Sequence, residues 1–279
     1  MTTPTQAEKA ASFAKLHTAG CFALANVWDM PSAALVAEAG AAALATSSAA
    51  VAFVHGLPDG EKISRDLMLA VAGNIARRMP LPVSADLEAG YGPAPEDVAE
   101  TVRLAIEAGL VGCNIEDRDP RTGKLFAFDD AVARIRAGTE AAKTAGLPDF
   151  TLNARTDPYL IGFGTAEENF AEAVKRANAY LGAGAGAAFV PGPADAKTIG
   201  ALVAAIGGPL NVMALPKTPP LAELARLGVR RLSLGSGLMN ATYGYTRRML
   251  EELKEKGEFG FIGEGVSFME FMQLLGKYR

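Results

Sequence analysis

Four carboxylates and one arginine follow apolar, strand-like stretches of this sequence of 279 residues. Asp86 and Glu88 end one such stretch, and the alternation of side chains along a strand places both on one face. Glu116 and Arg155 end two later stretches, and Asp59 lies in the loop after an earlier one. Carboxylates that share a face repel one another and resist burial unless a cation or water relieves their charge. The pattern predicts either a solvated strand end or an acidic binding site.

The elements that must position these residues alternate regularly along the chain. Several predicted helices end at a glycine that an apolar strand follows at once, as at Glu107-Ala108-Gly109. Glycine takes the left-handed cap that reverses the chain, so helix-to-strand links are short, and the longer strand-to-helix links carry the polar residues. The longest of these links is the predicted loop 49–63. The predicted strands cover residues 21–27, 42–48, 81–88, 111–116, 150–156, 187–190, 210–215 and 229–234.

Eight strand–helix alternations without a linker-like stretch predict one α/β domain, a (β/α)8 barrel of the TIM type. The competing fold is an open doubly wound sheet, which usually has a glycine-rich phosphate turn after its first strand. Residues 26–29 contain no glycine, which favours the barrel. We expect the barrel over residues 1–256, with helix 243–256 as its last, and a C-terminal helical tail over residues 257–279.

Composition excludes several classes of protein. The net charge of −4, the pI near 5.4 and the lack of a Lys/Arg run argue against a nucleic-acid partner. No apolar run has membrane-spanning length and no signal peptide is visible, so we expect a cytoplasmic protein without a membrane partner. Cys21 and Cys113 lie in apolar runs, which indicates core residues rather than a disulfide.

The carboxyl ends of barrel strands meet at one mouth, so the acidic residues are expected to lie together there. An all-oxygen set without paired His or Cys favours Mg²⁺, or Mn²⁺, over Zn²⁺. Arg155 could bind a substrate carboxylate with its planar fork of donors. The alternative is an arginine that pairs with Asp157 or Glu116 and has no catalytic role. Trp28, at the end of the first strand, could line the substrate pocket or serve in packing.

Five stretches, which cover the second to fifth strands, resemble the isocitrate lyase/phosphoenolpyruvate mutase superfamily. They are Thr46-Ser47-Ser48, Gly56-Leu57-Pro58-Asp59-Gly60, Asp86-Leu87-Glu88-Ala89-Gly90-Tyr91-Gly92, Asn114-Ile115-Glu116-Asp117 and Asn153-Ala154-Arg155-Thr156-Asp157. The resemblance implies an Mg²⁺-dependent site for 2-oxo acids or their enolates.

The resemblance also implies a role for each matching residue. Asp86 would bind the metal and contact substrate. The water ligands of the metal would be held by Asp59, Glu88 and Glu116. Ser47, Ser48 and Ala49 would offer groups to the substrate carboxylate, and Arg155 would bind substrate. We expect the catalytic residues to be Asp59, Glu116 and Arg155.

The loop after the fourth strand departs from the resembled family. Lyases of the family carry Lys-Cys-Gly-His in this loop, and phosphonomutases carry an Asn there and a His near the end of the sixth strand. Residues 118–124 contain no Cys, His or Asn, and the sixth strand ends Phe189-Val190-Pro191-Gly192. Arg118, Arg121 and Lys124 make the loop basic, so it could close over an anionic ligand or be an ordinary solvated loop.

These observations predict a lyase that acts on a small 2-oxo acid. Oxaloacetate-like decarboxylation is the expected reaction, because CO₂ leaves without a protein base. The alternatives are phosphonomutase-type P–C chemistry and a protein that binds a 2-oxo acid, such as 2-oxoglutarate, without turnover. The tail 257–279 is too apolar to lie free on a surface. The resemblance implies that its helix is exchanged between subunits of a homodimer or homotetramer, and the alternative is a helix that packs on its own barrel.

Overall fold

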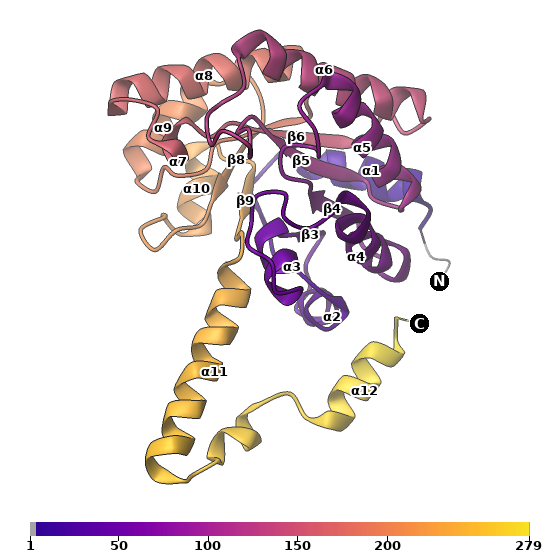
Figure 1. Cartoon of the computed structure of the whole chain (residues 1–279), viewed down its shortest axis with the longest axis vertical. Coiled ribbons are helices and arrows are strands. Elements are labelled where there is room, and N and C mark those ends of the chain that lie inside the picture. Colours follow the sequence, from indigo (N-terminus) through magenta and orange to yellow (C-terminus); the bar gives the residue numbers. More distant parts are fainter. Residues whose placement is uncertain (1–3, 279) are drawn as a thin grey trace.

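The computed structural model describes residues 4–278, and its centre is a sheet of nine parallel strands in the order β1-β9-β8-β7-β6-β5-β4-β3-β2. The sheet curls into a nearly closed barrel that helices surround (Figure 1). The strands are β1 Phe22–Leu24, β2 Asn26–Val27, β3 Leu44–Thr46, β4 Val83–Asp86, β5 Gly112–Glu116, β6 Thr151–Arg155, β7 Ala187–Phe189, β8 Leu210–Met213 and β9 Arg231–Ser233.

The first predicted strand is present in two pieces, β1 and β2, on either side of Ala25. β1 pairs with β9 and β2 pairs with β3, so the two short strands join the last strand of the barrel to the second one. The side chain of Asn26 bridges the same join: its amide donates to the Thr46 carbonyl at 2.9 Å, and its Oδ1 accepts the N–H groups of Leu234 and Gly235 at 2.8 and 2.9 Å. The predicted TIM-type barrel is confirmed.

The helices lie between and around the strands. Side-chain caps set several of their first residues; for example, Asp195 accepts the Thr198 N–H at 2.8 Å. Glycine ends others as predicted, and Gly109 takes φ +97° between helix and strand. The helices are α1 Gln6–Leu16, α2 Met30–Glu38, α3 Ser48–Val54, α4 Arg65–Arg78, α5 Pro95–Glu107, α6 Phe128–Thr144, α7 Pro158–Ile161, α8 Ala166–Gly182, α9 Ala196–Ala205, α10 Leu221–Leu227, α11 Gly237–Lys256, the 3₁₀ helix η1 Gly260–Glu264, and α12 Phe268–Gly276.

Three local predictions were wrong. The loop predicted from residue 49 contains α3, because Ser47 caps a run with three alanines and accepts the Ala50 N–H at 3.3 Å. α11 begins at Gly237 rather than at residue 243. β4 ends at Asp86, and Glu88 adopts φ +51°, so the alternation of a strand does not relate these two side chains.

α1 closes the barrel at the end opposite the longer loops. Phe13 is fully buried in the main hydrophobic core. A Cβ at Gly112 on β5 would lie 2.9 Å from the Phe13 ring, so the missing side chain makes room for it. Cys113 is buried and Cys21 is half-buried, and both are free thiols, which agrees with the predicted core positions.

The C-terminal residues form an arm. α11 leads away from the barrel and α12 returns to lie beside α2 (Figure 1). Its last turn packs on its own barrel: Leu274 is buried, and Lys277 Nζ lies 3.0 Å from a carboxylate oxygen of Glu38. Exchange of this helix between subunits stays a prediction. Within residues 4–278, no helix combines the length and apolar character that a membrane span requires.

Candidate active site

A pocket of about 250 Å³ opens at the carboxyl ends of the strands. It contains five of the residues predicted for the site, Ser48, Asp59, Glu88, Glu116 and Arg155, and its other lining residues are Gly60, Lys62, Arg118 and Pro120. A larger groove of about 720 Å³ lies between α5 and α6, but no predicted site residue lines it. We therefore take the smaller pocket as the candidate active site.

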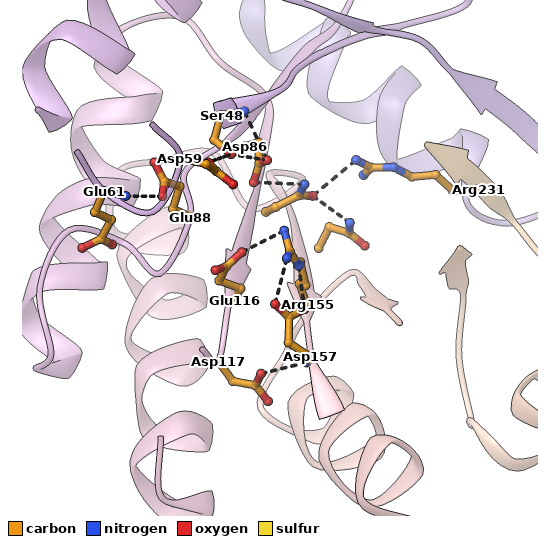
Figure 2. Close-up of polar contacts among 12 residues, drawn as sticks. Ser48, Asp59, Glu61, Asp86, Glu88, Glu116, Asp117, Arg155, Asp157 and Arg231 are labelled. Carbon is orange, nitrogen blue, oxygen red and sulfur yellow. Dashed lines mark hydrogen bonds and ion pairs between the residues drawn. The ribbon is translucent and has the colours of Figure 1, made fainter. Parts of the chain in front are cut away.

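Asp86 lies directly behind this lining and is held by polar neighbours on both sides (Figure 2). The Ser48 hydroxyl and backbone N–H donate to its Oδ2 at 2.8 and 3.3 Å. The same hydroxyl lies 3.4 Å from a carboxylate oxygen of Asp59, so Ser48 links the two acids. On the barrel side, the Asn114 amide lies 3.5 Å from Asp86 Oδ1, and Asn114 in turn accepts an N–H of the buried Arg231 at 3.3 Å.

Glu88 is the most unusual acid of the site. Its left-handed backbone costs about 1–2 kcal/mol in a residue with a side chain, yet its carbonyl accepts the Glu116 N–H at 2.8 Å, which keeps it beside β5. Its Oε2 accepts the backbone N–H of Glu61, whereas its buried Oε1 has no hydrogen-bond partner among the described residues. Burial, with the nearby charge of Asp59, raises the pKa of Glu88 to about 8. The pKa of Asp59 is also raised, by lost solvation and then by the charge of Asp86.

Arg155 is tied to two carboxylates. Its Nε and Nη2 donate to the two carboxylate oxygens of Asp157 at 2.7 Å each, and its Nη1 lies 2.8 Å from Glu116 (Figure 2). Burial lowers the pKa of Arg155, but the charges of Glu116 and Asp157 outweigh this and raise it, so the guanidinium stays charged. Burial raises the pKa of Glu116, and the charge of Arg155 opposes that shift. The three contacts use three of the five N–H donors of an arginine, which leaves two for a ligand.

The remaining predicted residues lie outside the pocket lining. Ser47 is buried as the cap of α3, Ala49 is half-buried on that helix, and Trp28 packs against the hydrophobic core. The structure therefore brings together the predicted acids, Ser48 and Arg155, whereas the predicted role of Trp28 in substrate binding stays a prediction.

Sequence reasoning missed Lys62. It lies three residues after Asp59, so its closeness to a predicted acid was the available signal. Arg118, from the basic loop, also lines the pocket. Arg121 of the same loop instead forms an ion pair with Asp119, in which Nε of Arg121 lies 2.9 Å from Oδ1 of Asp119.

The donor set fits a hard divalent cation. The acids offer only oxygen, and the unpartnered Oε1 of Glu88 together with the raised pKa values of Glu88 and Asp59 are features that a bound cation would relieve. Within residues 4–278, no three His, Cys, Asp or Glu side chains converge closely enough to form a ligand cluster. Magnesium often binds one or two carboxylates and keeps several waters, so the arrangement suits Mg²⁺ held partly through water.

The barrel and its acidic mouth define a class of protein: a TIM-type enzyme with a polar site at the carboxyl ends of its strands. The phosphoenolpyruvate phosphomutase family model matches residues 13–254. The chain belongs to this family, within the isocitrate lyase/phosphoenolpyruvate mutase superfamily, as the resemblance in the sequence implied.

Three similar proteins illustrate the range of the family. A solved structure from Burkholderia cenocepacia J2315, described provisionally as a lyase/mutase, is 41% identical with a TM-score of 0.90, and the match covers 97% of each chain. An uncharacterised protein of Mycobacterium tuberculosis is 35% identical over 81% of this chain and 82% of its own. The oxaloacetate decarboxylase of Pseudomonas paraeruginosa is 30% identical over 86% of this chain and 83% of its own. The chain is thus an enzyme of a family of lyases and mutases.

Proposed function

We propose that the chain catalyses Mg²⁺-dependent C–C cleavage of a small 2-oxo acid, with decarboxylation of an oxaloacetate-like substrate as its reaction. The observation that carries the proposal is one small mouth in which a charged arginine with two spare N–H donors faces three carboxylates. The arginine suits a substrate carboxylate, and the acids suit a cation. The similarity to an oxaloacetate decarboxylase supports this choice.

We assign the roles as follows. Asp86 would hold Mg²⁺, and Asp59, Glu88 and Glu116 would hold its water ligands. The bound ion supplies Lewis-acid stabilisation of the negative charge that develops on the 2-oxo oxygen. Arg155 binds and orients the carboxylate next to that oxygen, and the Glu116 and Asp157 contacts stop the guanidinium from turning.

The rim of the pocket supports a substrate with a second acidic group. Lys62 and Arg118 are exposed there, and in the part of the chain that the structure describes neither makes an ion pair. A four-carbon dicarboxylate would place one end at Arg155 and the other toward these cations. When the C–C bond breaks, its electron pair would pass into the enolate as CO₂ departs, and a proton from water would then convert the enolate to pyruvate. This needs no base from the loop that lacks Cys and His.

The proposal is tested by assaying oxaloacetate, phosphonopyruvate, isocitrate and 2-methylisocitrate with Mg²⁺, with Mn²⁺ and with EDTA, against blanks that contain metal alone. We expect pyruvate and CO₂ from oxaloacetate at a rate well above the metal blank, lost with EDTA and in Arg155→Met. Turnover of phosphonopyruvate instead would favour P–C chemistry, which the family description makes the second candidate. Tight binding of 2-oxoglutarate without turnover of any compound would favour the binding protein. The cytoplasmic location stays a prediction.

A further inference from the structure

Asp117 follows the site residue Glu116 directly, but its side chain points away from the pocket. It is 3% exposed and does not line the pocket. Its own backbone is fixed at both sides of the turn, since its N–H donates to the Arg155 carbonyl at 3.2 Å and its carbonyl accepts the Phe126 N–H at 2.8 Å. Asp117 therefore sits where β5, β6 and the end of the loop 118–126 meet.

Four donors converge on this buried carboxylate. Its Oδ2 lies 2.6 Å from the Tyr180 hydroxyl, 2.7 Å from the Thr156 hydroxyl and 3.3 Å from Nη1 of Arg176. Tyr180 and Arg176 both belong to α8, on the outside of the barrel. Such a dense set of short, charged hydrogen bonds holds a carboxylate in one orientation.

The fourth donor connects Asp117 to the active site. Oδ1 of Asp117 accepts the backbone N–H of Asp157 at 3.0 Å, and the side chain of Asp157 binds Arg155 in the two-pronged contact at 2.7 Å (Figure 2). The position of Asp157 therefore determines where the bidentate ion pair with Arg155 forms. A small shift of the Asp157 backbone would therefore turn the guanidinium away from Glu116 and from a ligand.

We propose that Asp117 is a positioning residue: through Asp157 it fixes the orientation in which Arg155 binds an anionic substrate, and α8 supplies the donors that hold Asp117. The inference rests on the proposed function, because it takes Arg155 as the substrate-binding arginine. It adds a chain of contacts that runs from the outer helix to the mouth, Tyr180 to Asp117 to Asp157 to Arg155.

Tyr180→Phe tests the chain of contacts without touching the pocket, since it removes one donor to Asp117 and keeps the buried ring. We measure the Kd of oxalate, a planar dianion that mimics a 2-oxo acid enolate, by calorimetry with Mg²⁺ present, and the KM and kcat for oxaloacetate. We expect the Kd and the KM to rise about three- to tenfold, part of the worth of a hydrogen bond to a charged group. kcat should change less than about twofold, because Arg155 holds substrate and transition state alike. Asp117→Asn should give a larger loss in the same direction, and Tyr180→Phe remains informative if that variant folds poorly.

Tyr159→Phe is the matched control. Its hydroxyl is buried but has no partner among the described residues, so its removal breaks no hydrogen bond, and the oxalate Kd should stay within about twofold of wild type. An equal loss in Tyr159→Phe, or an unchanged Kd in Tyr180→Phe despite a lower melting temperature, would overturn the inference alone. Wild-type protein that binds no oxalate would overturn both the inference and the proposed function.

Discussion

At the residue scale, Glu88 combines three unfavourable features: a left-handed backbone, a buried oxygen without a hydrogen-bond partner among residues 4–278, and neighbours of the same charge. Backbone strain of this kind persists only where surrounding structure enforces it, and it is often found at functional sites. Here the Glu61 and Glu116 backbones hold the residue in place. The arrangement makes sense if the carboxylate must face a cation from this turn.

The raised pKa of Glu88 predicts how stability depends on pH. Its pKa is about 8 in the folded protein and near 4.5 when unfolded, so between these values the folded state holds a proton that the unfolded state lacks. This contribution to the stability of the folded state is complete below about pH 4.5 and is lost as the pH rises through about 8, at up to about 1.4 kcal/mol per pH unit.

In EDTA, Glu88→Gln should therefore gain stability relative to wild type between pH 5 and pH 8. Urea denaturation at several pH values measures the difference; the exposed control Glu255→Gln should run parallel to wild type. Equal pH profiles for wild type and Glu88→Gln would contradict the prediction.

Lys62 gives a second prediction at this scale. If it attracts the distal acid of the substrate, Lys62→Met should raise the KM for oxaloacetate by up to about fivefold, because an exposed charge pair contributes up to about 1 kcal/mol. Inhibition by pyruvate, which has a single carboxylate, should change little. Steady-state kinetics at low and high salt measure both, and the effect should shrink at high salt through screening. Lys197→Met on α9 removes an exposed charge that does not line the pocket; a similar loss in that variant would reject the role of Lys62.

At the element scale, periodicity and glycine caps were enough to predict the barrel, because helix–glycine–strand repeats depend on local chemistry alone. The meeting of Asp59, Glu88, Glu116 and Arg155 followed from the barrel itself, since parallel strands end at one face. The position of Glu88 could not be derived, because its positive φ is set by contacts with Glu61 and Glu116 that are distant in sequence. The break at Ala25 likewise depends on pairing with β9, about 200 residues later along the chain.

The helix α1, which closes the barrel at the end opposite the longer loops, gives a prediction at this scale. Phe13 is fully buried and fits the space above Gly112, so Phe13→Ala should leave a cavity and cost about 3–5 kcal/mol of unfolding free energy. Because α1 lies at the end of the barrel opposite the pocket, oxaloacetate turnover should persist at temperatures where the variant stays folded. Urea denaturation measures the cost. The control Phe163→Ala removes a half-exposed ring and should cost much less. A cost below about 1 kcal/mol for Phe13→Ala would show that α1 does not seal the barrel.

At the scale of the whole molecule, the arm formed by α11 and α12 presents apolar side chains to solvent. Phe259, Ile262, Phe268 and Met269 are each more than 60% exposed. Large exposed apolar surfaces usually mark an interface. We propose that they meet a second copy of the chain in a homodimer or homotetramer. Exchange of the C-terminal helices stays a prediction, because the last turn of α12 contacts its own barrel through Leu274 and Lys277.

The oligomer is tested by light scattering after size exclusion. Wild-type protein should have the mass of a dimer or tetramer, and the double change Phe268→Glu with Met269→Glu should lower it, because two buried charges in an apolar interface cost several kcal/mol. Leu221→Glu, on the exposed side of α10, should leave the mass unchanged. A monomeric wild type at tens of micromolar would contradict the proposal.

The join that Asn26 makes has a consequence for how the protein is made. Its amide oxygen binds backbone N–H groups of Leu234 and Gly235, more than 200 residues further along. A ribosome releases residue 26 long before residue 234, so β1 has no β9 to pair with during most of synthesis. The nascent chain must carry an open sheet edge, which is prone to aggregation, until the last strand emerges. Closure of the barrel is therefore a late event of translation, and chaperone demand should be greatest just before it.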